Sequence, residues 1–150
     1  MHPCLTQDVS LKVIPVGTAH TAGSVVVEVV EDKVIYAGDV LYGGRLPAVL
    51  SVSRVDGWIA AFDGLRGFGD ILFVPSHGIP GMLTEFEDST YRYLSTLMSQ
   101  IDKAVEQNMD LQEAIRSLDQ PAWQHLADFD ALKGRNAHQV YLEPEAVAFE

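Results

Sequence analysis

The sequence predicts an α/β (α+β) protein in which one mainly antiparallel or mixed sheet is covered by helices. Short runs rich in β-branched residues fill residues 1–82, whereas helical periodicity and capping patterns fill residues 83–150. One strand-helix-strand order in the first part adds a crossover, and strands followed by helices are typical of a sheet with helices packed on it. We expect residues 1–150 to form a single domain, with a sheet-rich part that carries the candidate site and a helical part.

Four strands are expected in the sheet-rich part. The runs LKVIPV (residues 11–16) and SVVVEVV (residues 24–30) are short and rich in β-branched side chains. The run KVIYAGD (residues 33–39) follows acidic turn residues, which predicts a hairpin with the strand before it. DILFVP (residues 70–75) is a continuous apolar run closed by proline, a pattern typical of a buried strand that follows a helix.

One face of the second predicted strand is wholly apolar. Val25, Val27 and Val29 alternate along it, and the opposite face carries only one charged residue, Glu28. Such a sheet should be covered on at least one side.

Helices are expected over residues 53–65, 84–107 and 110–118, with further helical material towards the C-terminus. The first range repeats apolar residues at the i, i+3, i+4, i+7 spacing of a helix with one buried stripe. Thr84 and Asp110 each precede a glutamate by three residues, so both predict a helix start with a capping box.

Composition excludes several classes of function. The formal net charge of −11 is spread along the chain and should repel polyanions, so no nucleic-acid partner is expected. A single cysteine, Cys4, leaves neither an internal disulfide framework nor a thiolate zinc cluster within one chain. No run approaches the ~18 apolar residues of a membrane span, and the first residues lack an export pattern. We therefore expect a cytoplasmic protein without a membrane partner.

Three residues with metal-binding side chains each follow a predicted strand. His20, Asp39 and His77 stand beside glycine in AHTAG, AGD and SHG. If the strand ends cluster, two imidazoles and one carboxylate converge at the sheet edge, where ligand sites of α/β sheets usually lie. Two histidines and an aspartate are a reasonable ligand set for zinc, although each residue alone also suits a solvated turn.

Three stretches that contain these residues resemble the C-terminal half of a metallo-β-lactamase-fold hydrolase. They are GTAHTAGSVVVEVVEDKVIYAGDVLYGGRLP, GWIAAFDGL and VPSHGIPG, which together span about residues 11–81. The resemblance implies half of a four-layer αββα sandwich. It also implies a site for one or two ions, zinc or else iron or manganese, where water is activated to attack an ester, thioester, amide or related bond.

The resemblance also implies roles for the three residues. His20 would bind the first metal ion, Asp39 would bridge both ions, and His77 would bind the second. Ser76 departs from the glycine that usually precedes the last histidine.

The family's first metal motif, H-x-H-x-D-H, is absent from this sequence. No two of the five histidines lie that close together; they are His2, His20, His77, His125 and His138. The aspartate of that motif usually orients or deprotonates the attacking water. The resemblance therefore implies a truncated hydrolase with impaired activity, and no catalytic residue is assigned.

Three other side chains have two interpretations each. Arg45, in GGRLP, is a candidate contact for an anionic substrate or simply a solvated turn residue. His125 and His138 lie in stretches that are expected to be helical, where they should face water while neighbouring apolar residues pack. Those neighbours are Trp123, Leu126 and Phe129.

Two alternatives to an active hydrolase remain open. One is a non-catalytic half-domain or interaction module that forms a homodimer through the exposed valine face, because half of a sandwich leaves one sheet face without its partner. The other is a longer enzyme whose first half precedes the given start. For a hydrolase, the substrate is a small molecule of unknown identity.

Overall fold

The strands of this computed structural model form one mixed sheet, in the order β1-β2-β3-β4. The structure describes the backbone of residues 9–147 and the side chains of residues 9–143. The strands are β1 (Leu11–Gly17), β2 (Ser24–Val29), β3 (Val34–Tyr42) and β4 (Leu72–His77). β1 pairs with β2 and β2 pairs with β3 in antiparallel fashion, whereas β3 and β4 are parallel. The predicted mixed sheet is confirmed.

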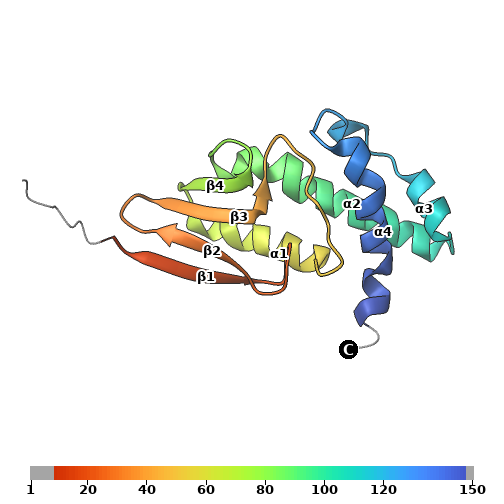
Figure 1. Ribbon diagram of the computed structural model, residues 1–150, viewed down its shortest axis with the longest axis horizontal. Helices are drawn as coiled ribbons and strands as arrows, with labels where there is room; N and C mark the ends of the chain where they lie inside the picture. Colours follow the sequence, from red (N-terminus) through yellow and green to blue (C-terminus); the bar gives the residue numbers. More distant parts are fainter. Residues whose placement is uncertain (1–8, 148–150) are drawn as a thin grey trace, which may run out of the picture.

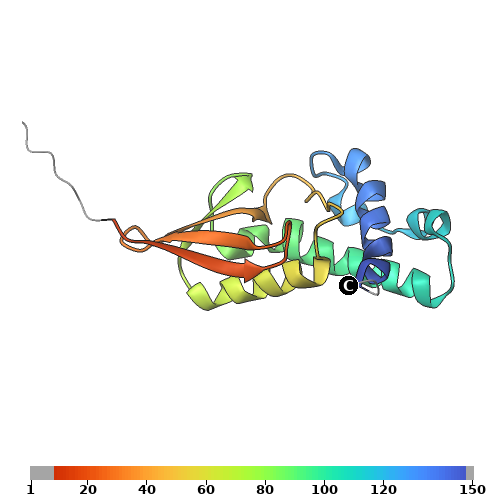
Figure 2. The same cartoon turned by 60° about the horizontal axis from the view of Figure 1, so that its bottom comes forward.

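Helices cover one face of this sheet, and no helix of the described residues lies over the other face (Figure 1, Figure 2). The α-helices are α1 (Val55–Leu65), α2 (Tyr93–Glu106), α3 (Leu111–Ser117) and α4 (Phe129–Val147). α1 lies against the sheet with α2 beside it, and α3 and α4 pack on α2 beyond the end of the sheet. The α/β (α+β) prediction is confirmed. Among residues 9–147 no helix is both long and apolar enough to cross a membrane.

The core lies between the sheet and α1. Val26, Ile35 and Phe73 point from three neighbouring strands into this layer and are fully buried. Trp58 and Phe62, from the stripe predicted on α1, are fully buried in the same cluster. Burying side chains of this size contributes roughly 1.5–3 kcal/mol each, so this layer is a main source of stability.

The helical segment before α2 begins near Thr84, as predicted, but with a different capping pair. It starts at Leu83 with a 3₁₀ turn, and a π-helical turn (Glu87–Arg92) follows before α2. Thr84 does not cap this segment. The capping residue is Met82, whose N–H donates to the carboxylate of Glu85 at 2.8 Å. The other predicted capping box, at Asp110, is confirmed by reciprocal hydrogen bonds with Glu113.

A buried amide holds the segment after β3 against the helices. Asn136 on α4 is fully buried, and its Oδ1 accepts the N–H of Val49 at 2.9 Å. Its Nδ2 donates to the carbonyl of Pro47 at 2.8 Å and to the hydroxyl of Tyr93 at 2.9 Å. Because every partner is buried, this network joins the loop, α2 and α4 as one packed unit.

We expect Asn136→Ala to lower the free energy of unfolding by about 3 kcal/mol. The substitution leaves two or more buried polar groups without a hydrogen-bond partner, and each such group costs about 1–3 kcal/mol. Urea unfolding followed by circular dichroism measures this loss. His138→Ala, at an exposed position of the same helix, is the control and should change the value by less than about 0.5 kcal/mol. Equal effects of the two substitutions would contradict the role given to the network.

Candidate functional site

The three predicted ligand residues come from neighbouring elements at one end of the sheet. His20 lies in the turn between β1 and β2, and His77 is the last residue of β4. Asp39 lies within β3 and His77 within β4, so neither follows the end of its strand as predicted. β3 bends here, because Gly38 adopts a φ of 53° and the pairing with β4 is irregular from this point on. The bend takes Asp39 out of the regular ladder.

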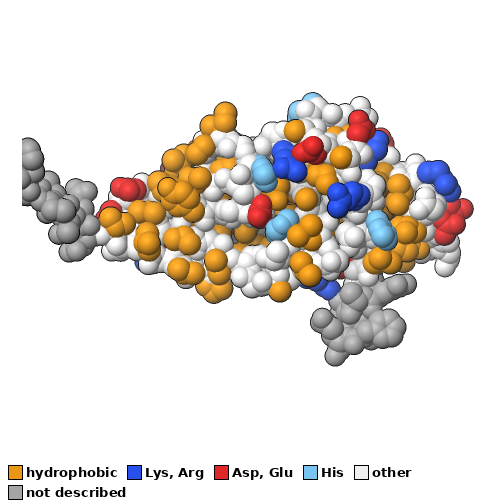
Figure 3. Space-filling view, viewed as in Figure 1, with side chains coloured by type: hydrophobic (Ala, Val, Ile, Leu, Met, Phe, Trp, Pro, Cys, Tyr) orange, Lys and Arg blue, Asp and Glu red, His pale blue; other side chains and the backbone are white. Residues whose placement is uncertain are grey.

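Tyr42 lies among the three residues, and sequence reasoning missed it. Its ring centroid is 6.3 Å from that of His20 and 5.2 Å from that of His77. Its hydroxyl donates a 2.9 Å hydrogen bond to Oδ1 of Asp39. Figure 3 shows two histidine side chains beside an acidic one over this end of the sheet. The structure thus gathers His20, Asp39 and His77 around one buried tyrosine.

No sequence pattern points to this tyrosine. Residues three apart on a regular strand face opposite sides, so Asp39 and Tyr42 were not expected to meet. They meet because β3 bends at Gly38. The helical part then holds Tyr42 in place, since the side-chain hydroxyl of Thr90 accepts its N–H at 2.9 Å and Ser89 donates to its carbonyl.

Two hydroxyl groups converge on one oxygen of Asp39. Besides Tyr42, Oγ of Ser76 donates to Oδ1 at 2.6 Å. Partial burial acts to raise the pKa of Asp39, but these hydrogen bonds and the nearby imidazoles of His20 and His77 outweigh it and lower the pKa. Burial, together with the hydrogen bond to Asp39 and its charge, raises the pKa of Tyr42. At neutral pH the site therefore holds a carboxylate and a protonated phenol.

The imidazole of His20 has an unused buried nitrogen. Its Nδ1 is buried and has no hydrogen-bond partner among the described residues. The ring packs edge-on against Trp58, with centroids 5.2 Å apart, while the backbone carbonyl accepts from Oγ of Ser53 at 2.6 Å. A buried polar atom without a partner costs stability unless a ligand or water satisfies it, so this nitrogen suits a ligand-binding role.

The side chains of His20, Asp39 and His77 have the atom types that bind a zinc-type ion, but they are not arranged as a complete set of ligands around one point. Imidazole nitrogen and carboxylate oxygen are ordinary zinc ligands, and no described group donates to Oδ2 of Asp39. Within the part of the chain that the structure describes, however, no three His, Cys, Asp or Glu side chains are grouped so as to hold a metal ion. The three residues are neighbours, not a preformed metal cage.

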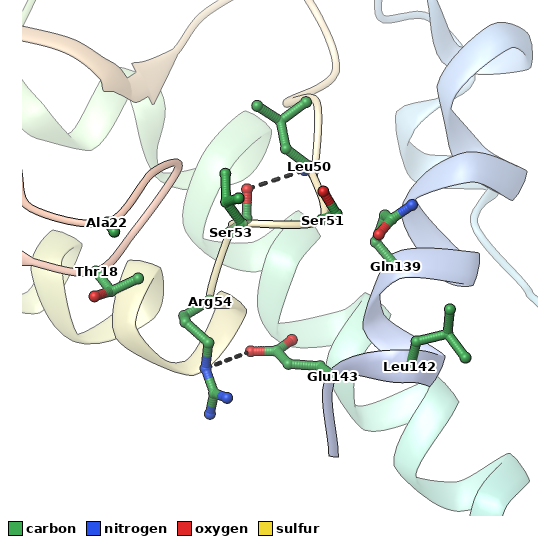
Figure 4. A pocket seen from close by; sticks show the side chains of 10 residues that line it. Thr18, Ala22, Leu50, Ser51, Ser53, Arg54, Gln139, Leu142 and Glu143 are labelled. Carbon is green, nitrogen blue, oxygen red and sulfur yellow. Dashed lines mark hydrogen bonds and ion pairs between the residues drawn. The ribbon is translucent and has the colours of Figure 1, made fainter. Parts of the chain in front are cut away.

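A hollow lies beside the turn between β1 and β2 (Figure 4). Its volume is about 550 Å³, and the turn, the loop around Ser53 and helix α4 line it. Arg54 and Glu143 both line the hollow, and Nε of Arg54 lies 3.1 Å from Oε1 of Glu143. Burial raises the pKa of Glu143. Ser53 lines the hollow and also binds the carbonyl of His20, so the loop connects the two features.

The remaining candidates lie apart from this cluster. Nε of Arg45 lies 2.8 Å from Oδ2 of Asp128, so its guanidinium already joins two loops; contact with a substrate stays a prediction. His125 and His138 are exposed as expected, but His125 follows a 3₁₀ turn (Pro121–Trp123) and is not in a helix. His2 lies outside the described residues.

The fold is a mixed sheet with helices on one face, and the candidate site places imidazole and carboxylate groups at one end of that sheet. A model of the metallo-beta-lactamase superfamily matches residues 2–92, which is more than half of the chain. The chain belongs to this superfamily, as the resemblance predicted. In a comparison with curated proteins, nothing matches the chain.

Solved structures show the same partial fold. The metallo-beta-lactamase from Pontibacter korlensis superposes with a TM-score of 0.51 at 23% identity, over 61% of this chain and 46% of that one. The DIM-1 metallo-beta-lactamase gives a TM-score of 0.50 at 19% identity, over 60% of this chain and 46% of its own. The chain thus spans less than half the length of these proteins, and the likeness concerns the fold alone.

We expect Ser76→Ala to raise the pKa of Asp39 towards its usual range, because the lost hydrogen bond favours the ionised form. Carbon-13 NMR of the carboxyl group against pH measures this change. Because the pKa of Asp39 is lower in the native state than in the unfolded state, its ionised form stabilises the fold above the unfolded pKa, and this contribution is lost as pH falls through the native pKa. The variant has a smaller pKa shift, so acid should lower its free energy of unfolding less. Ser117→Ala, whose hydroxyl binds only the carbonyl of Ala114, is the control. An unchanged pKa in Ser76→Ala would contradict the assignment.

Proposed function

We propose that this chain carries one half of a metal-dependent hydrolase site, with His20, Asp39 and His77 as ligands to a zinc-type ion. The observation that carries the proposal is the meeting of two imidazoles and an ionised carboxylate around Tyr42 at one end of the sheet. Membership of the metallo-beta-lactamase superfamily supports it. Iron and manganese are the alternatives to zinc.

The hydrogen bonds at Asp39 favour one ion over two. Two hydroxyl groups donate to Oδ1, whereas Oδ2 has no donor among the described residues. Since an oxygen that accepts two hydrogen bonds has little capacity left for a cation, Asp39 in this arrangement offers one free oxygen. We therefore propose that Asp39 serves a single ion and does not bridge a pair.

A bound zinc-type ion would act as a Lewis acid that activates water for attack on an ester, thioester, amide or related bond. The residues of the chain prepare the place for it. Ser76 and Tyr42 fix the orientation of the Asp39 carboxylate and keep it ionised, and Ser53 anchors the backbone of His20. None of the described residues is assigned as a general base. Outer groups that support metal ligands typically change affinity 10–100-fold, so we expect the isolated half-site to bind and hydrolyse weakly.

We expect purified protein to bind about one Zn²⁺ per chain and the double variant His20→Ala, His77→Ala to bind it at least about tenfold more weakly, because two of three ligands are lost. Competition with a chromophoric chelator measures the affinity, and mass spectrometry of the elements detects zinc, iron and manganese in the protein as purified. The matched control is His125→Ala, His138→Ala, which removes two exposed histidines outside the site.

Two results would overturn the metal proposal. One is a wild-type protein that holds no more zinc, iron or manganese than the His20, His77 double variant. The other is an equal loss of affinity in the control pair, which would assign the binding to surface histidines.

The bare sheet face favours a second candidate function, a non-catalytic module that assembles through its sheet. Val25, Val27 and Val29 lie on this face, and Val25 is 46% exposed. A protein that assembles but binds no metal ion in the competition assay would support this second candidate against the first.

A further inference from the structure

The turn that carries His20 is held from one side by the start of helix α1. The N–H of Arg54 donates to the carbonyl of Ala19 at 2.9 Å, and Oγ of Ser53 donates to the carbonyl of His20 at 2.6 Å. Trp58 packs edge-on against the imidazole, with ring centroids 5.2 Å apart. One short segment therefore positions both the backbone and the ring of His20.

Gly57, in the first turn of α1, brings the helix very close to the same turn. A Cβ atom at Gly57 would lie 2.0 Å from the carbonyl oxygen of Thr18, so only glycine fits here. Because backbone packs directly on backbone, no flexible side chain lies between them to absorb a displacement. A movement of the start of α1 should therefore move the turn that carries His20.

Glu143 of α4 fixes the start of α1. Arg54 is the N-cap residue of this helix, but its side chain caps no N–H. Instead Oε1 of Glu143 accepts the N–H of Val55, the first helical residue, at 2.9 Å. The same oxygen lies 3.1 Å from Nε of Arg54, and Figure 4 shows these two side chains facing each other. A side chain 88 residues away in sequence thus supplies the cap that the N-cap residue lacks.

Helix α4 holds the loop between β3 and α1 at two points. Asn136 binds the backbone of Pro47 and Val49, and Glu143 binds the backbone where α1 begins. The two residues are about two helical turns apart, so they lie on the same face of α4. The side chain of Glu143 is only 14% exposed, so solvent does not readily replace its hydrogen bonds. Helix α4 therefore acts as a frame for the loop that holds the His20 turn.

We propose that Glu143 is a positioning residue for His20, which acts through the start of α1. The proposal rests on the assignment of His20 as a metal ligand. Groups that support a metal ligand usually contact its side chain, whereas here the support passes through the backbone of α1 and of the turn. The helical part of the chain thereby sets the position of one ligand.

NMR of the metal-free protein tests the positioning directly. The indole of Trp58 shifts the proton signals of the His20 ring, so these signals report where the ring lies. We expect Glu143→Ala to move the His20 signals and to leave those of the exposed His125 unchanged. Glu143→Gln keeps an oxygen that can accept the N–H of Val55, so its His20 signals should stay near the wild-type positions.

Zinc affinity in the chelator assay is the second readout. Loss of a group that supports a metal ligand directly costs 10–100-fold, and Glu143 acts one step further out, so we expect Glu143→Ala to weaken Zn²⁺ binding by about threefold to tenfold. Glu113→Ala is the matched control, because the carboxylate of Glu113 also accepts a backbone N–H at a helix start, that of Asp110 at 2.9 Å. It should lower stability but change neither the His20 signals nor the zinc affinity.

A pair of glycine variants tests the same link if Glu143→Ala does not fold. Gly57→Ala must displace the carbonyl of Thr18, whereas a Cβ atom at Gly64 of the same helix meets no atom within 4 Å. Gly57→Ala should move the His20 signals and weaken zinc binding, and Gly64→Ala should do neither. Circular dichroism confirms that each variant is folded.

The results separate this proposal from the metal proposal. Wild-type zinc binding that neither Glu143→Ala nor Gly57→Ala weakens, with the His20 signals in place, overturns the positioning role and leaves the metal proposal standing. An equal effect of Glu113→Ala also overturns it, because general loss of stability then explains the result. A wild-type protein that binds no zinc overturns both proposals.

Discussion

The parallel pairing of β3 with β4 determines where the polar groups of the site lie. Parallel strands end at the same edge of a sheet, because the α1 crossover carries the chain back to the opposite edge, where β4 begins beside the start of β3. Tyr42 therefore pairs with His77, and the N–H of Gly43 donates to the carbonyl of His77 at 2.8 Å. Without this pairing neither Ser76 nor His77 would lie beside Asp39 and Tyr42.

Sequence periodicity predicted the elements and the approximate position of the site, because both follow from local patterns. The strands, the stripe on α1 and the cap at Asp110 depend on neighbours a few residues apart. Tyr42 depends instead on a bend in β3 and on Thr90, which is distant in sequence. Such non-local hydrogen bonds leave no spacing signal in a single sequence. The helix start near Thr84 was right, but the capping pair was wrong, because it is Met82 with Glu85 and not Thr84 with Glu87.

Successive residues along each strand point to opposite faces of the sheet, and this alternation explains two properties of the molecule. One set of alternate residues, such as Val26 and Ile35, forms the core with α1, and the other set, such as Val25 and Tyr36, is exposed on the opposite face. A sheet that is apolar on both faces is usually covered on both. The composition that made the sheet predictable therefore also leaves apolar side chains exposed on the side of the sheet away from α1.

Tyr42 joins the site to the helical part of the chain. Its ring is buried, its hydroxyl holds Asp39, and its backbone is held by Ser89 and Thr90 of the π-helical turn. π-helical turns are rare and often occur at functional sites, and here the turn brings two adjacent hydroxyls onto one residue. The position of the carboxylate thus depends on packing between the sheet and the helices.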